Sequence, residues 1–98
     1  MLKKTFNARE NNCKVTFVLP AQVQANTAYL CGDFNGWDKT THLMKKQKDG
    51  SFKLIITLET GRQYSFRYLL DGDRWENDWQ ADAYISNEFG TENSVINL

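Results

Sequence analysis

FKLIITLETGRQYSFRYLL, residues 52–70, contains two runs in which apolar and polar side chains alternate. The apolar positions are Phe52, Leu54, Ile56 and Leu58 in the first run, and Tyr64, Phe66, Tyr68 and Leu70 in the second. Successive side chains of a strand point to opposite faces, so each run predicts a strand with one face in a core. Together with the residues before them, the runs predict an antiparallel pair of hairpins over residues 45–67.

The same period of two recurs elsewhere in the chain. Val15, Phe17 and Leu19 alternate with more polar residues until Pro20 ends the run, and shorter candidate strands lie at 27–31, 42–48, 74–79 and 94–98. Turn signals separate the runs at Asn35-Gly36, Asp49-Gly50, Thr60-Gly61, Asp71-Gly72 and Phe89-Gly90. No segment has a sustained helical period. About seven short strands at this spacing predict an all-β sandwich or a small barrel.

Length and charge limit the classes of protein to consider. We expect residues 1–98 to form a single domain, because 98 residues suit one core and not two. Twelve basic residues balance twelve acidic ones, so the net charge offers no broad field for nucleic acid or an anionic membrane.

The expected location is the cytoplasm. No apolar stretch follows the N-terminal lysines as in a signal peptide, and no run approaches the ~20 residues of a membrane span. In such a protein Cys13 and Cys31 are expected to be reduced, structural thiols, and a disulfide between them is the alternative.

Catalytic and metal-binding patterns have little support. His42 is the only histidine and lies in a polar stretch, where a solvated side chain is expected. The acidic residues between 71 and 82 do not match an EF-hand, and a solvated turn is the expected setting for them. The glycines are scattered singly, which excludes a phosphate-binding loop. We therefore expect no catalytic residues, no metal and no cofactor.

The tryptophans are the unusual feature of the chain. Trp37, Trp75 and Trp79 fall outside the alternating runs, at or near turns. An exposed indole can stack on the apolar face of a pyranose ring, while groups such as Arg67 and Asn93 can bridge neighbouring hydroxyls. The alternative is that the indoles cap the open ends of a sandwich. The pattern alone leaves both interpretations open.

Three blocks of the chain resemble family 48 carbohydrate-binding modules. YLCGDFNGW, residues 29–37, resembles their G-x-F-N-x-W signature, and QYSFRYLLDGDRW, residues 63–75, resembles their Y-x-F-x-x-D-G-x-W hairpin. FGTENSVI, residues 89–96, resembles their closing G-T-x-N-x-hydrophobic strand. The blocks occur in the family's order and cover residues from about 27 to 98.

The resemblance implies an immunoglobulin-like, early-set β-sandwich of about seven antiparallel strands that binds α-1,4-linked glucan such as glycogen or starch. Such domains occur in the β subunit of AMP-activated kinase and, as isoamylase N-terminal domains, ahead of glucan branching and debranching enzymes. By this resemblance Trp37 and Trp75 are the two platforms and Arg67 stands where a binding lysine is found. Phe89 replaces a leucine that enters cyclic glucans, and the polar contacts of the closing strand are Thr91 and Asn93.

The chain departs from the family pattern in three ways. One residue is inserted before Trp75, which could turn that indole away from the shared face. Trp79 stands where kinase-type domains have proline, and it could be either a third platform or a core side chain. The sequence contains no catalytic barrel. The alternative function is therefore a protein-interaction or accessory domain for a glycogen branching or debranching enzyme, whereas an independent enzyme lacks both a cleft and a catalytic constellation.

Overall fold

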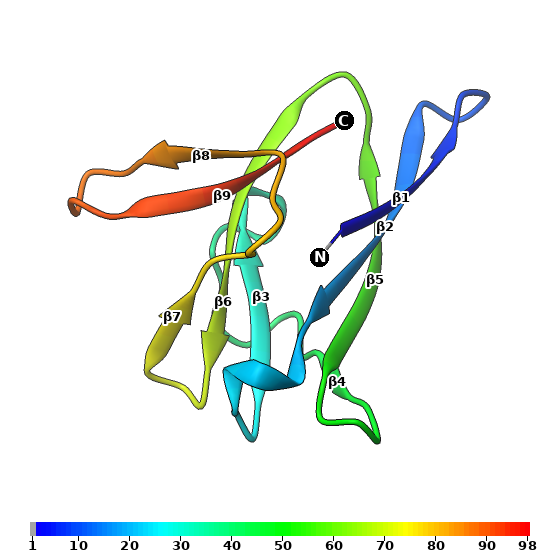
Figure 1. The fold of residues 1–98 in the computed structure, drawn as a ribbon. Coiled ribbons are helices and arrows are strands. Elements are labelled where there is room, and N and C mark those ends of the chain that lie inside the picture. The colour runs from blue at the N-terminus through cyan, green and yellow to red at the C-terminus, as the bar shows by residue number, and fades with distance from the viewer. Residues whose placement is uncertain (1) are drawn as a thin grey trace.

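The computed structural model describes residues 2–98 and consists of two antiparallel sheets packed face to face (Figure 1). The first sheet has the strand order β1-β2-β5-β4, with β1 at Leu2–Asn7, β2 at Asn12–Leu19, β5 at Phe52–Glu59 and β4 at Lys45–Lys46. The second has the order β3-β6-β9-β8, with β3 at Ala28–Gly32, β6 at Gln63–Leu70, β9 at Glu92–Asn97 and β8 at Ala83–Ser86. Strand β7, Arg74–Glu76, also pairs with β6. Two 3-10 turns cover Ala21–Val23 and Asp33–Asn35.

This architecture confirms the predicted all-β, immunoglobulin-like sandwich. Residues 2–98 form nine strands, where about seven were expected. Strands β1 and β8, which were not predicted from the sequence, lie at the ends of their sheets. Most side chains of these edge strands are exposed, so neither strand carries the apolar alternation that reveals a half-buried strand.

The predicted pair of hairpins over residues 45–67 is only half right. Strand β4 does pair with β5, but β5 continues into β6 of the opposite sheet and does not pair with it. Instead β5 pairs with β2, while β6 lies between β3 and β9. The alternating pattern of each strand shows which face is buried. It does not say whether two apolar faces lie side by side in one sheet or meet across the core.

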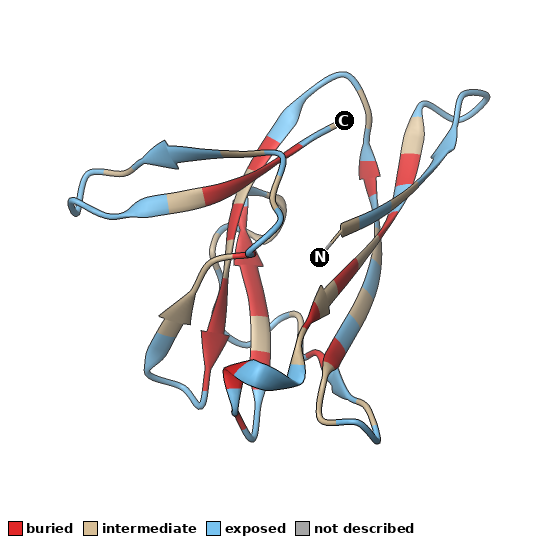
Figure 2. Ribbon diagram, in the orientation of Figure 1, coloured by how far each residue is buried: buried red, intermediate tan, exposed pale blue. Residues whose placement is uncertain are grey.

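The core lies between the two sheets and contains most of the buried residues (Figure 2). Phe17 of β2 meets Phe66 of β6 across it, with ring centres 5.2 Å apart in an edge-to-face arrangement. Phe66 in turn contacts Tyr68 at 5.7 Å. The alternating residues that predicted β2 and β6 therefore supply facing layers of one core.

One member of the acidic cluster is not in a solvated turn, contrary to expectation. Asp78 is buried, and its Oδ2 accepts a hydrogen bond of 2.7 Å from the Tyr68 hydroxyl. Its backbone N–H donates to Ser94 Oγ at 2.9 Å. Burial raises the pKa of Tyr68 well above its usual value, and the nearby Asp78 carboxylate raises it further. Asp78 therefore supports the inner face of the second sheet.

Both cysteines are free and buried, as expected. Cys13 contributes to the core, whereas Cys31 lies on the outer face of β3, opposite Arg67 of β6. Burial, followed by the negative charge of Asp38, raises the pKa of Cys31. Because the thiolate is the reactive form and a raised pKa favours the thiol, Cys31 is a packing group and not a nucleophile.

Nothing in the described residues is built to cross a membrane as a helix. Among residues 2–98 no helix has the length and apolar composition that a membrane span requires.

Candidate functional site

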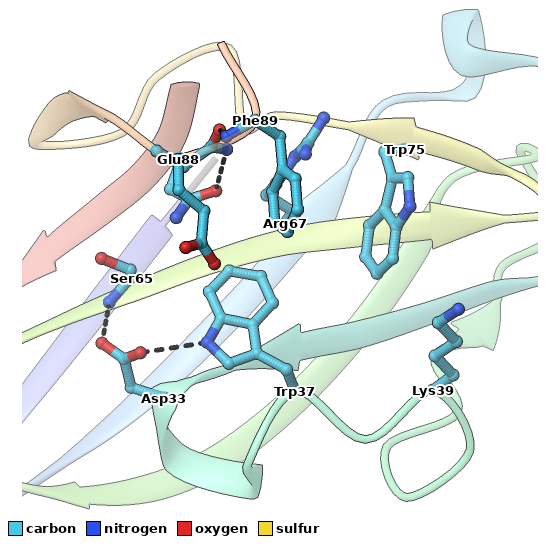
Figure 3. Close-up of a pocket in the computed structure, with 10 residues that line it drawn as sticks. Asp33, Trp37, Lys39, Ser65, Arg67, Trp75, Glu88 and Phe89 are labelled. Carbon is cyan, nitrogen blue, oxygen red and sulfur yellow. Dashed lines mark hydrogen bonds between the residues drawn. The ribbon is translucent and has the colours of Figure 1, made fainter. Parts of the chain in front are cut away.

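A groove of about 600 Å³ lies on the outer face of the second sheet, away from the core (Figure 3). The β3–β4 loop, strands β6, β7 and β9 and the β8–β9 turn contribute its walls. The lining residues are Asp33, Trp37, Lys39, Ser65, Arg67, Trp75, Asn87, Glu88, Phe89 and Asn93. Five of the six side chains proposed from the sequence therefore lie in one groove, and Thr91 is the exception.

The period of two explains why this face carries polar and aromatic side chains. Along β6 the core receives Phe66 and Tyr68, so the intervening Arg67 points to the opposite face. Trp75 of β7 lies directly opposite Leu69 of β6, in the same outward set as Arg67. Alternation along β6 and pairing with β7 therefore bring Arg67 and Trp75 together.

The residue inserted before Trp75 does not turn its indole away. Asp71 and Gly72 both have positive φ, 54° and 80°, and Asp73 N–H closes a tight turn by donating to Leu70 O at 3.2 Å. The strand pairing resumes at Leu70 and Arg74, so Asp73 is left outside the ladder. The extra residue is absorbed in the turn, and Trp75 lines the same groove as Trp37.

Trp37 is carried by a loop that its neighbours hold closely. Its backbone N–H donates to Gly32 O at 2.9 Å, and Gly36 and Trp37 both adopt left-handed backbone conformations, with φ of 65° and 60°. For a residue other than glycine this conformation costs roughly 1–2 kcal/mol. Gly32 is required for a different reason, because a Cβ there would lie 2.6 Å from Ser65 O. The loop therefore fits against β6 with no room for a side chain.

Asn35 and His42 brace the same loop from inside. The Asn35 amide donates to Leu30 O at 2.9 Å and accepts from Gly32 N–H at 3.1 Å. Its Nδ2 also lies 2.8 Å from Nδ1 of His42, whose ring meets Phe34 edge-on at 6.2 Å. His42 is half-buried, so the expectation of a solvated histidine was wrong.

Asp33 fixes the direction of the Trp37 indole, a role that the sequence analysis missed. One carboxylate oxygen accepts from Trp37 Nε1 at 3.1 Å, and the other accepts from the Ser65 backbone N–H at 2.8 Å (Figure 3). A single side chain thus ties the indole to strand β6. An aspartate four residues before a loop tryptophan was the available signal, but only the fold brings it next to Ser65.

The Trp75 end of the groove is cationic. The Arg67 guanidinium carbon lies 5.4 Å from the centre of the Trp75 ring, and Lys39 Nζ lies 6.0 Å from the same centre. Within residues 2–98 neither cation forms an ion pair with a carboxylate. Arg67 Nε is buried and has no hydrogen-bond acceptor in the described part of the chain. This end therefore holds positive charge that the protein does not neutralise by pairing.

Asn87 organises the turn that carries Phe89. Its Oδ1 accepts from Phe89 N–H at 3.0 Å and from Thr91 N–H at 3.2 Å, while its Nδ2 donates to Thr91 Oγ1 at 2.8 Å and Asn93 Oδ1 at 3.1 Å. Phe89 is 81% exposed at this tip. Thr91 does not line the groove. Its hydroxyl is hydrogen-bonded to Asn87. The supporting role of Asn87 was not predicted from the sequence.

Trp79, whose role the sequence left open, neither lines the groove nor enters the core. Its side chain is 55% exposed, and its Nε1 donates to Glu76 Oε1 at 3.0 Å. Trp79 is therefore a natural control for the two tryptophans of the groove.

Acidic and metal-binding groups are few in the groove. Of its two acidic residues, Asp33 already accepts hydrogen bonds at both carboxylate oxygens. Within residues 2–98 no group of three or more His, Cys, Asp and Glu side chains is arranged to hold a metal ion. What the groove offers a ligand is half-buried aromatic rings, a guanidinium and side-chain amides.

Comparison with known proteins shows similarity to a protein family and to a glucan-modifying enzyme. Residues 10–98 match the family model described as the glycogen recognition site of AMP-activated protein kinase. The chain is also 27% identical over 62 residues to the 1,4-alpha-glucan branching enzyme GlgB of Butyrivibrio fibrisolvens. That alignment covers 63% of this chain and 10% of the enzyme, so this chain corresponds to a small part of the relative.

Proposed function

Because this chain belongs to the family of glycogen-recognition domains, the type represented by family 48 carbohydrate-binding modules, we propose that it binds α-1,4-linked glucan in the groove and catalyses no reaction. The ligand would be glycogen, starch or a shorter oligosaccharide of the same linkage. The family supports glycogen recognition in general, and the side chains of the groove support the choice of this surface.

The observation that carries the proposal is that Trp37 and Trp75 line one open groove, each half-buried. A pyranose ring presents an apolar C–H face that can lie on an indole while its hydroxyls remain at the rim. By analogy with base–aromatic stacking, each such contact contributes roughly 1–3 kcal/mol. After the cost of association, two contacts correspond to a dissociation constant of roughly micromolar to millimolar.

Polar groups beside the rings suit the sugar hydroxyls. Arg67 offers a planar fork of donors next to Trp75. Asn93 accepts from Asn87 through its Oδ1, which leaves its amide N–H groups for a ligand. Phe89, at the exposed tip, adds an apolar surface at the opposite wall. In this proposal Thr91 acts through its hydrogen bonds to Asn87 and does not touch the sugar.

The test is isothermal titration calorimetry with maltoheptaose and β-cyclodextrin. Trp37→Ala and Trp75→Ala should each weaken binding about five- to 150-fold, because each removes a stacking contact of roughly 1–3 kcal/mol. Trp79→Ala is the matched control, since this exposed tryptophan lies outside the groove. Retained β-type circular dichroism would show that the variants fold. Equal affinity in wild type and Trp37→Ala would contradict the proposal.

The accessory-domain function remains a second candidate because of the relative. The match to GlgB covers 10% of that enzyme, so the corresponding segment of the relative is joined to a much larger protein. Retardation in an amylopectin affinity gel would favour glucan binding by this chain itself. Co-elution with a purified branching enzyme, without such retardation, would favour the accessory role. Unchanged amylopectin chain length after incubation would support the absence of catalysis.

The cytoplasmic location is part of the proposal. Two free, buried thiols suit a reducing compartment. Fractionation of cells that express the protein from its own gene would test it.

A further inference from the structure

We propose that the groove prefers α-glucan that carries an anionic substituent, a phosphate monoester, and that Lys39 and Arg67 hold this group beside Trp75. The inference rests on the proposed function, since it assumes that glucan occupies the groove. It adds the chemical class of glucan that the site selects.

Two cations lie close to one aromatic ring of the groove. Arg67 Cζ and Lys39 Nζ lie 5.4 and 6.0 Å from the centre of the Trp75 indole. They come from separate elements, since Arg67 belongs to β6 and Lys39 to the loop between β3 and β4. A glucose unit stacked on Trp75 would therefore lie within reach of both charges. Neutral hydroxyls need donors and acceptors, but they do not need two full positive charges.

Neither of these two charges, Lys39 and Arg67, is paired with a carboxylate in the described part of the chain. The Arg67 Nε–H is buried without an acceptor among the described residues, and an unsatisfied buried donor is costly. An oxygen-rich anion at this end could supply the missing acceptor after a small movement of the side chain.

Charged side chains are unevenly distributed along the groove. The acidic side chains that line it, Asp33 and Glu88, gather around Trp37, whereas Lys39 flanks Trp75 (Figure 3). Both oxygens of Asp33 are engaged by Trp37 and Ser65, so Asp33 does not serve as a partner for the cations. A substituent of negative charge is therefore favoured at the Trp75 end and opposed at the other.

A phosphate monoester fits this chemistry better than a carboxylate. It carries close to two negative charges at neutral pH and three strong acceptor oxygens. Arginine binds such a group with its planar fork and lysine with a point charge. Attached to a glucose unit, it leaves one face of the pyranose free for the indole. Phosphate is also present in nucleotide sugars and as the free ion, so the test must separate these sources.

The experiment is calorimetry of the whole protein with maltoheptaose and with maltoheptaose that bears one 6-phosphate. The phosphorylated ligand should bind about tenfold more tightly at low salt, the effect of two exposed charge contacts. The preference should shrink toward unity at about 0.5 M salt, where charges are strongly screened. ADP-glucose and inorganic phosphate should compete at least tenfold less well than the phosphorylated glucan.

Lys39→Met is the decisive variant, because it keeps the aliphatic stem and removes the charge. In this variant the preference for phosphorylated over unmodified maltoheptaose, the ratio of their dissociation constants, should fall from about tenfold to about threefold, because only the charge of Arg67 remains. Lys53→Met, on the outer face of the first sheet, is the matched control and should leave the ratio unchanged.

Three results would overturn the inference: no preference in the wild type, an unchanged ratio in Lys39→Met, or equal competition by ADP-glucose or free phosphate. Failure of the proposed function is a separate result, because it appears as loss of binding to unmodified maltoheptaose. Binding of that neutral ligand without a preference for phosphate would leave the proposed function intact and reject only this inference.

Discussion

At the scale of single residues, the groove depends on side chains that position others. Asp33 holds the Trp37 indole through one oxygen and β6 through the other. Asn87 does the same for the tip that carries Phe89. An aromatic ring contributes to binding only when its orientation is fixed before the ligand arrives, since ordering it on binding costs free energy. Sequence motifs identify the rings more easily than their supports.

We predict that Asp33→Asn weakens maltoheptaose binding about three- to tenfold. The amide can accept from only one of the two N–H groups, so either the indole or the Ser65 backbone loses a hydrogen bond worth about 1 kcal/mol. Calorimetry measures the effect. Asp49→Asn is the control, since Asp49 caps Ser51 in the turn before β5. Wild-type affinity in Asp33→Asn would show that Trp37 needs no such support.

At the scale of elements, the β6–β7 turn is fixed to the start of β3. The Asp71 carboxylate accepts from the backbone N–H groups of Asn26 at 2.8 Å and Thr27 at 3.0 Å. These two hydrogen bonds lower the pKa of Asp71 below its usual value, and the bond from Thr27 has the larger effect. The turn that sets the register of Trp75 thus has a charged anchor.

The anchor gives stability a defined pH dependence. Because the folded-state pKa of Asp71 is lower than the unfolded one, its contribution is present above the unfolded pKa of about 3.9. It is lost as the pH falls through the folded-state value. We predict that Asp71→Asn lowers the Tm at pH 7 and reduces the drop in Tm between neutral and acid pH. Thermal melts of both proteins along a pH series measure this. Parallel curves for the two proteins would contradict it.

At the scale of the whole molecule, zero net charge does not mean an even surface. The outer face of the first sheet carries four exposed lysines, Lys3, Lys14, Lys45 and Lys53. The acidic residue that the strands of this sheet place on the same face is Glu59. Most acidic residues belong to the second sheet and its loops. Zero net charge therefore offers no broad field, yet it leaves a local concentration of positive charge on one face.

We predict that the folded protein binds a cation-exchange resin near pH 7, although its sequence pI is about 6.6. The lysine face can meet the resin while the acidic loops point away. Lys14→Glu combined with Lys53→Glu should elute at clearly lower salt. A control with the same change in net charge, Lys39→Glu with Arg62→Glu, alters residues outside that face and should shift elution less. Equal shifts would mean that only total charge matters.

Three motifs of the sequence resemble those of a glycogen-recognition domain, whereas the alternation of side chains and the turn signals predicted the half-buried strands and the turns between them. Short-range stereochemistry sets these features, because the side-chain period of a strand and the positive φ of a turn are written in neighbouring residues. The aromatic residues of the groove were predicted from the same local motifs.

The tertiary structure alone decided which strands pair and which side chains support the groove. The chain changes sheets between β5 and β6, because β5 pairs with β2 whereas β6 pairs with β3. Asp33 meets Ser65, and Lys39 meets Trp75, across long stretches of chain. Such contacts form because packing brings distant segments together, and no local pattern in the sequence records them.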